Sequence, residues 1–274
     1  MADLKPQVYK DPRPAEHFTR YHERARRGIG WTYKLVRVLL TPPTLLVYRA
    51  RAIGMKNVPK DGPAIITPNH FSQMDHFFSA VFLRRRVQFM AKSQLFTNPI
   101  LVHIFSHGGV FPVRRGYNDQ EAFITAHAVL AREGRDCIVL MYAEGGRSRT
   151  GSLGEPKRGV GKLALESGAP VVPVAIHGSA SVRRWKKLRF PKVTVQYGAP
   201  VSFDRVESPT PEQQQEAAEK VFERVRAMYD ALEAKGRRGV LRDLRHGDEP
   251  GPLHLSVAAA PGAAERQRAE SHSS

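Results

Sequence analysis

Two side chains capable of acid–base chemistry stand five positions apart in this chain, at His70 and Asp75. The apolar run over residues 64–67 comes just before them and has the composition of a β-strand. A carboxylate beside an imidazole fixes the tautomer of the ring and stabilises its charged form. The pair therefore predicts a general base that takes a proton from a hydroxyl group.

The spacing of the pair restricts the backbone around it. Five residues of regular helix would rotate Asp75 by about 500° from His70, which places the two on different faces. They can meet only if His70 lies in a loop and Asp75 in the first turn of the next helix. Ser72 and Asp75 form an S-x-x-D capping box, which predicts a helix beginning at Ser72. The alternative is a simple helix cap beside a surface imidazole.

Two glycine- and arginine-rich segments follow strand-like runs farther along the chain. The first, over residues 108–116, contains two arginines, Arg114 and Arg115, and the planar fork of an arginine can grip a phosphate. The second contains Gly145 and Gly146, where backbone amides could approach an anion, and Arg147, which adds a charge. Glu144 could orient Arg114 or Arg147. For each segment, an ordinary solvated turn is the structural alternative.

Taken in chain order, four segments resemble the glycerolipid acyltransferases of the 1-acylglycerol-3-phosphate O-acyltransferase type, a PlsC-like family. The segment from Asn69 to Asp75 is similar to the N-H-x-S-x-x-D box of that family, and residues 108–114 to its G-x-x-F-x-x-R block. Residues 142–148 resemble its F-P-E-G-T-R-S block, and residues 172–176 its V-P-V-x-I block. The resemblance spans about residues 54–200, and four blocks in order are far more specific than one.

The resemblance implies a reaction and a role for each residue. His70 would take the proton of an acceptor hydroxyl, with Asp75 holding the ring, and the oxygen would attack an acyl thioester. Arg114 and Arg147 would hold the acceptor phosphate in a pocket shaped by Glu144, Gly145 and Gly146. The co-substrate would be acyl-CoA or an acyl carrier protein thioester, with no metal and no other cofactor.

This chain departs from the family pattern in the third block. Tyr142 and Ala143 replace Phe and Pro, and Gly146 replaces Thr. The missing hydroxyl at Gly146 bears on the identity of the acceptor more than on the chemistry. The leading acceptor is 1-acylglycerol 3-phosphate, a lysophospholipid, which would give phosphatidic acid in phospholipid synthesis. Glycerol 3-phosphate or another lipid hydroxyl is the alternative acceptor, and a basic nucleic-acid- or membrane-binding module without catalysis is the alternative class.

The charge of the chain indicates an anionic partner. The formal net charge is +17, so the surface favours acidic lipid, phosphorylated substrates, an acidic carrier protein or nucleic acid. We do not expect nucleic acid, because anionic lipid explains the basic run over residues 183–189 equally well. The N-terminal residues lack the apolar core of a signal peptide. We expect a peripheral or monotopic protein on the cytoplasmic side of a membrane.

The most apolar long segment runs from Trp31 to Tyr48. It carries two basic residues and is broken by Pro42 and Pro43, so it suits a membrane interface better than a bilayer span. It predicts a pair of amphipathic helices with Trp31, Tyr33 and Tyr48 at the headgroup level. An ordinary helix packed on the domain is the alternative.

Strand-like and helical runs alternate through the middle of the chain, which predicts an α/β fold with a mixed, largely parallel sheet flanked by helices. The last helix should begin at the capping box Thr210–Gln213. We expect three regions: a basic helical membrane-interface segment over 1–53, an acyltransferase domain over 54–235, and a basic, disordered tail over 236–274.

Overall fold

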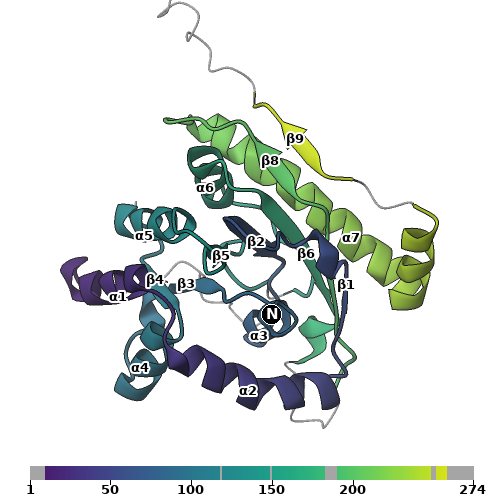
Figure 1. The fold of residues 1–274 in the computed structure, drawn as a ribbon, viewed down its shortest axis with the longest axis horizontal. Helices are drawn as coiled ribbons and strands as arrows, with labels where there is room; N and C mark the ends of the chain where they lie inside the picture. Colours follow the sequence, from purple (N-terminus) through teal and green to yellow (C-terminus); the bar gives the residue numbers. More distant parts are fainter. Residues whose placement is uncertain (1–9, 118, 149, 183–189, 248–250, 258–274) are drawn as a thin grey trace, which may run out of the picture.

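The computed structural model describes residues 10–117, 119–148, 150–182, 190–247 and 251–257. The basic run over residues 183–189 and most of the C-terminal tail lie outside these described residues. Figure 1 shows a single central sheet with helices on both faces, which confirms the predicted α/β class. The helices are α1 (Glu16–Arg27), α2 (Trp31–Leu46), α3 (Asp75–Val81), α4 (Pro99–His107), α5 (Gln120–Leu130), α6 (Gly159–Ser167) and α7 (Pro211–Arg245). The short 3-10 helices are η1 (Met55–Asn57) and η2 (Ser93–Leu95).

The sheet is largely parallel, as predicted. Its strands are β1 (Arg51–Ile53), β2 (Ala64–Pro68), β3 (Gln88–Lys92), β4 (Val110–Val113), β5 (Ile138–Leu140), β6 (Val171–His177), β7 (Thr194–Tyr197), β8 (Val201–Phe203) and β9 (Leu253–Leu255). The main path runs β1-β7-β6-β2-β5-β3-β4. Strands β6, β2, β5, β3 and β4 run parallel to one another, whereas β7 and β8 pair with β6 in the antiparallel sense. The carboxyl ends of β2, β3, β4 and β5 therefore lie along one edge, where α/β proteins bind ligands.

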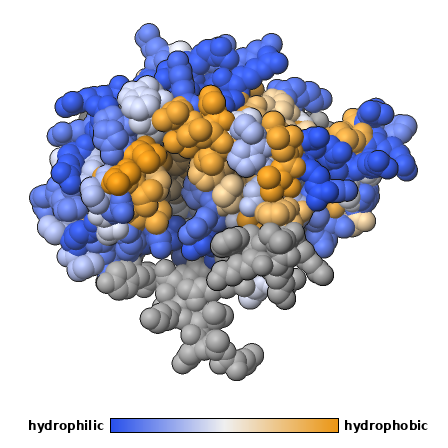
Figure 2. Space-filling model, turned by 90° about the horizontal axis from the view of Figure 1, so that it is seen from below, coloured by the Kyte–Doolittle hydropathy of each residue, from blue (hydrophilic) through white to orange (hydrophobic). Residues whose placement is uncertain are grey.

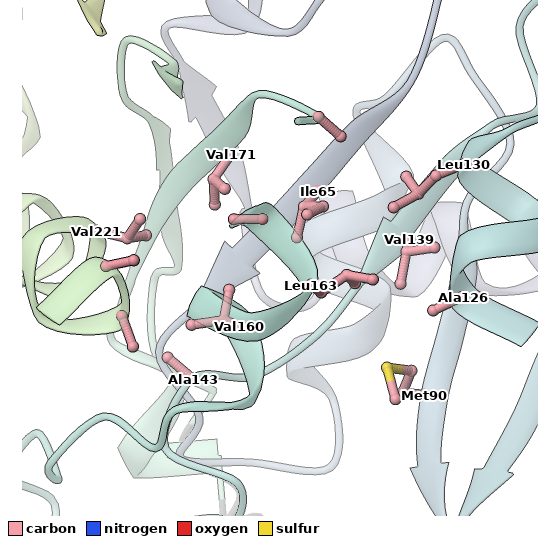
Figure 3. Close-up of a cluster of buried hydrophobic side chains, with 14 of the residues drawn as sticks. Ile65, Met90, Ala126, Leu130, Val139, Ala143, Val160, Leu163, Val171 and Val221 are labelled. Atoms are coloured by element: carbon pink, nitrogen blue, oxygen red, sulfur yellow. The ribbon is translucent and has the colours of Figure 1, made fainter. Parts of the chain in front are cut away.

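The two faces of the sheet carry separate cores. One face packs against α5, α6 and α7, and Figure 3 shows Ile65, Val139 and Val171 of the sheet directed toward Leu163 of α6 and Val221 of α7. The other face packs against α2 and α3 through residues such as Tyr33 and Phe78. Strands buried on both faces read as continuous apolar runs, which is why β2, β5 and β6 could be predicted from the sequence.

The N-terminal apolar segment differs from the predicted helix pair. It forms one helix, α2, with Pro42 and Pro43 inside it. Proline removes the donors for the carbonyls of Val38 and Leu39, and these two residues lie on the exposed side of the helix, where water can replace the donors. The prolines therefore do not break the helix.

The three aromatic residues of this segment also differ from the prediction. Only Trp31 is largely exposed, whereas Tyr33 is buried in the core and Tyr48 packs edge-on against Phe78. Tyr33 and Tyr48 are therefore packing residues. Within the described residues, no helix combines the length and apolar composition needed to cross a bilayer.

The region after residue 235 also differs from the prediction of a disordered tail. Helix α7 continues to Arg245 after a kink at Gly236, which has a positive φ of 61°. The second part of α7 packs Val240 against the core, and β9 adds to the sheet beside β8. The sequence obscured this order because the apolar residues there are few and spaced among arginines.

Candidate functional site

His70 and Asp75 meet at the carboxyl end of β2, as the sequence predicts. His70 lies in the loop after the strand and Asp75 is the first residue of α3, three residues later than the predicted start. The Nδ1 atom of His70 lies 3.0 Å from Oδ2 of Asp75. Because a carboxylate only accepts, Nδ1 carries the proton and Nε2 is left with the lone pair that a general base needs.

Asp75 also organises the backbone of the loop. Its side chain is fully buried, and Oδ2 accepts hydrogen bonds from the amides of Phe71 and Ser72, each at 2.6 Å. The amide of Ser72 contacting the Asp75 carboxylate is half of the expected capping box. These two amides are already committed to Asp75, so they are not the donors that a developing oxyanion near His70 would require.

The backbone of His70 is fixed from two sides by the loop after β5. Its amide donates to Oε1 of Glu144 at 2.7 Å, and its carbonyl accepts from the amide of Ser148 at 2.8 Å. Glu144 Oε2 accepts from the amide of Gly154 at 2.8 Å. Glu144 therefore ties the histidine loop to the glycine-rich loop, in place of the predicted role of orienting an arginine. Burial raises the pKa of Glu144 to about 7, against the opposing effect of these two amides.

Asn69 is a positioning residue whose role the sequence reasoning did not identify. Its side chain forms two hydrogen bonds with the backbone of Ile176 in β6, donating at 3.1 Å and accepting at 2.7 Å. This pair of contacts anchors the end of β2 to its neighbour. An Asn directly before the histidine was the available signal.

Aromatic rings enclose the imidazole. The ring of Tyr142 stacks on that of His70 with a centroid distance of 3.8 Å, and His76 approaches edge-on at 5.2 Å. Burial lowers the pKa of His70 below its usual value, while the hydrogen bond that its ring donates to Asp75 raises it, and burial lowers the pKa of His76 to about 4. His70 is consequently neutral, and competent as a base, at neutral pH.

The arginine beside the histidine is Arg115, not the predicted Arg114. Arg114 turns away: its guanidinium donates to the carbonyl of Arg13 at 3.1 Å and lies over the ring of Tyr117. The charges of Arg115 and Arg147 both lower the pKa values of His70 and Lys92, so both arginines lie close enough to act electrostatically on each of these groups. Arg114 directly follows β4 and Arg115 lies in the turn after it, so these two neighbouring side chains do not take the same direction.

Gly145 and Gly146 lie in the loop after β5, next to the cationic cluster Lys92, Arg115 and Arg147. Gly145 has a positive φ of 64°, and a Cβ at this position would meet the side chain of Lys157 at 2.9 Å. The loop therefore needs glycine at 145. No group of His, Cys, Asp and Glu side chains in the described part of the chain has the arrangement of a metal site.

An apolar cavity of about 500 Å³ is lined by His76, the residue whose ring approaches His70 edge-on. Its lining also includes Gln73 and Phe89, and it extends between α2 and α4 past Leu40 and Ile104. Cavities of this size hold small-molecule ligands. A buried base, a group of cations and an apolar cavity thus meet at one edge of the sheet.

Comparisons with known proteins agree with this geometry. Residues 49–177 match the family model described as Acyltransferase. A protein of Arabidopsis thaliana named 1-acyl-sn-glycerol-3-phosphate acyltransferase LPAT1, chloroplastic, is 30% identical over 137 residues, which are 49% of this chain and 38% of that protein. The human 1-acyl-sn-glycerol-3-phosphate acyltransferase beta is 32% identical over 139 residues, 48% of each chain. The matches thus cover about half or less of these relatives.

The fold also matches a solved structure. The crystal structure of the 1-acyl-sn-glycerophosphate (LPA) acyltransferase PlsC from Thermotoga maritima superposes with a TM-score of 0.57 at 22% identity. The match covers 79% of this chain and 80% of that one. The likeness establishes a shared architecture across most of the chain, including elements outside residues 49–177.

Proposed function

We propose that this chain belongs to the acyltransferase family whose model residues 49–177 match, and that it moves a fatty acyl group from an acyl thioester to the hydroxyl of 1-acylglycerol 3-phosphate, giving phosphatidic acid. The observation that carries the proposal is the meeting of three features at one edge of the sheet. These are the buried pair His70–Asp75, the cations Arg115, Arg147 and Lys92, and the apolar cavity. They match the hydroxyl, the phosphate and the acyl chain of the two substrates.

The geometry supports a direct transfer. Nε2 of His70 takes the proton of the acceptor hydroxyl as its oxygen attacks the thioester carbonyl carbon. The tetrahedral intermediate then collapses with cleavage of the carbon–sulfur bond, and the imidazolium returns its proton to the departing sulfur. Asp75 stabilises the imidazolium between the two steps. The acceptor oxygen is the nucleophile, so no acyl-enzyme forms.

Arg115 and Arg147, with Lys92, form the proposed acceptor phosphate site. Arginine forks and a lysine point charge are both suited to phosphate. Burial and Arg147 lower the pKa of Arg115, which means that three like charges face each other at a cost. A dianionic phosphate among them would relieve that repulsion.

A non-catalytic basic module is the less favoured alternative. Binding a phosphate requires cations but no general base. Burying an imidazole beside a carboxylate that accepts three hydrogen bonds costs desolvation energy, and phosphate binding alone does not require that arrangement. An alternative acceptor such as glycerol 3-phosphate remains within the same chemistry, and an acceptor panel distinguishes the two.

The proposed partner surface is an anionic membrane, on its cytoplasmic side. Exposed apolar side chains gather on the face where α2 lies, and Figure 2 shows them in orange among hydrophilic surroundings. They come from α2, as Trp31, Val38, Leu39 and Leu46, and from α4, as Ile100. Patches of this kind mark interaction sites, and the apolar cavity lies between the same two helices. A lipid substrate could therefore pass from the bilayer into the cavity.

The catalytic assignment predicts the effects of two substitutions. His70→Ala should lower turnover by about 10²–10⁴-fold in a thioester-release assay with 1-acylglycerol 3-phosphate, while the chain remains folded. Asp75→Asn should be similarly severe.

The direction of the His70 pKa shift predicts the pH dependence of the reaction. Because burial lowers the pKa of His70 in the folded chain, kcat/KM of the natural chain should fall only below pH 6.5, where the base becomes protonated. In Asp75→Asn this acid limb should move to still lower pH, since the carboxylate raises that pKa. Near-normal turnover of folded His70→Ala would rule out the mechanism.

The phosphate site predicts a contrast between neighbouring arginines. Arg115→Ala should raise the KM for the phosphorylated acceptor by about tenfold or more, while the KM for the acyl donor changes little. Arg114→Ala is the matched control and should leave the acceptor KM within about twofold. The reverse ranking of the two variants would show that Arg114, not Arg115, holds the phosphate.

The membrane proposal predicts a position-specific effect of one charge. The full chain should sediment with anionic vesicles and be released only in part by high salt, because apolar contacts persist when charges are screened. Val38→Asp on α2 should reduce the bound fraction several-fold. Ile124→Asp, at an exposed apolar position on α5, should not. Equal loss in both variants would contradict docking through α2.

A further inference from the structure

A second cavity, the α1–α4 groove, lies on the other side of α4 from the apolar cavity. Its volume is about 600 Å³, and its lining comes from α1, α4 and the segment between η2 and α4. The two cavities share α4 as a wall, since Leu101, Ile104 and Phe105 face one and Val102, Ser106 and His107 face the other. The α1–α4 groove is not used by the proposed transfer chemistry.

The lining of the α1–α4 groove is basic. It includes three arginines and three histidines, and no carboxylate is among its lining residues: Arg13, Arg20, Arg24, His17, His103 and His107. Arg13 is paired with Asp11 at 2.7 Å, so its charge is neutralised. Arg20 and Arg24 stand one turn apart on α1, and neither forms an ion pair with any described residue. Two uncompensated guanidinium groups in a concave site favour a phosphate-bearing ligand.

The α1–α4 groove begins next to the proposed acceptor site. Arg13 donates to the carbonyl of Ser93 at 2.8 Å, and Ser93 directly follows Lys92 of the cationic cluster. The carbonyl of Arg13 accepts from Arg114, the neighbour of Arg115. Residue 13 therefore bridges the carboxyl ends of β3 and β4 to the near end of the groove.

We infer that the α1–α4 groove binds the phosphorylated nucleotide end of coenzyme A, which makes acyl-CoA the acyl donor. The inference rests on the proposed function, because it places the third part of a donor whose acyl chain occupies the apolar cavity and whose thioester lies at His70. A concave site of this volume has the size of a small-molecule pocket, whereas a carrier protein would need a larger, open docking surface. The negative charge of a nucleotide bisphosphate matches Arg20 and Arg24.

Calorimetric titration of the full chain with adenosine 3′,5′-bisphosphate tests this site without turnover. The natural chain should bind the nucleotide, and Arg24→Ala should weaken the Kd by about tenfold. Arg27→Ala removes one charge from the same helix outside the groove and is the matched control, with an expected change within about twofold. In the transfer assay, Arg24→Ala should raise the KM for acyl-CoA, but not for an acyl carrier protein thioester or for the acceptor.

Several outcomes would overturn the inference. The natural chain could fail to bind the nucleotide, or Arg24→Ala and Arg27→Ala could weaken nucleotide binding equally. Arg24→Ala could also raise the KM for acyl-CoA and for the acyl carrier protein thioester by the same factor. Weaker binding of Arg24→Ala to phosphatidate vesicles with an unchanged nucleotide Kd would identify a lipid headgroup site instead. Acyl transfer without nucleotide binding would overturn the groove assignment alone, whereas nucleotide binding without acyl transfer would overturn the proposed function and the donor role together.

Discussion

The site depends on a carboxylate that has no exposed surface. Asp75 is buried, and its Oδ2 atom accepts from the imidazole of His70 and from two backbone amides of the intervening loop. Such a group is stable only if these donors remain in place, because an unpaired buried charge is costly. The turn from β2 to α3, the tautomer of His70 and the direction of its Nε2 atom are all fixed by this one side chain.

The surrounding loops supply the rigidity that this arrangement requires. Asn69 ties the end of β2 to β6, and Glu144 ties the backbone of His70 to the loop after β5. Both are polar residues used on backbone groups, so the base is positioned by the sheet rather than by a flexible surface loop. The cations and the apolar cavity are arranged around the Nε2 atom of His70, whose position is fixed in this way.

The sequence predicted the parts of this structure that are determined locally. The buried strands β2, β5 and β6 are continuous apolar runs, and the loop carrying His70 and Asp75 is defined by its spacing. The sequence around Arg114 and Arg115 does not determine which of the two side chains faces the sheet edge, because this depends on where β4 ends in the folded sheet. The roles of Asn69 and Glu144 also depend on strands and loops distant in sequence.

The N- and C-terminal regions show a second limit of sequence reasoning. Two prolines suggested a break in the segment Trp31–Tyr48, yet α2 continues through them because the carbonyls that lose donors lie at exposed positions. The order of the second part of α7 and of β9 depends on packing against a sheet already formed. The secondary structure of both regions is therefore determined by tertiary contacts.

The central claim is that Asp75 holds His70 as a neutral base with its proton on Nδ1. Nitrogen NMR of histidine-labelled protein across pH 4–8 tests it directly, with His70→Ala used to assign the signal. The account predicts an Nδ1–H tautomer at pH 7 and protonation with a pKa below 6.5. An Nε2–H tautomer at neutral pH, or a His70 pKa well above 6.5, would contradict it.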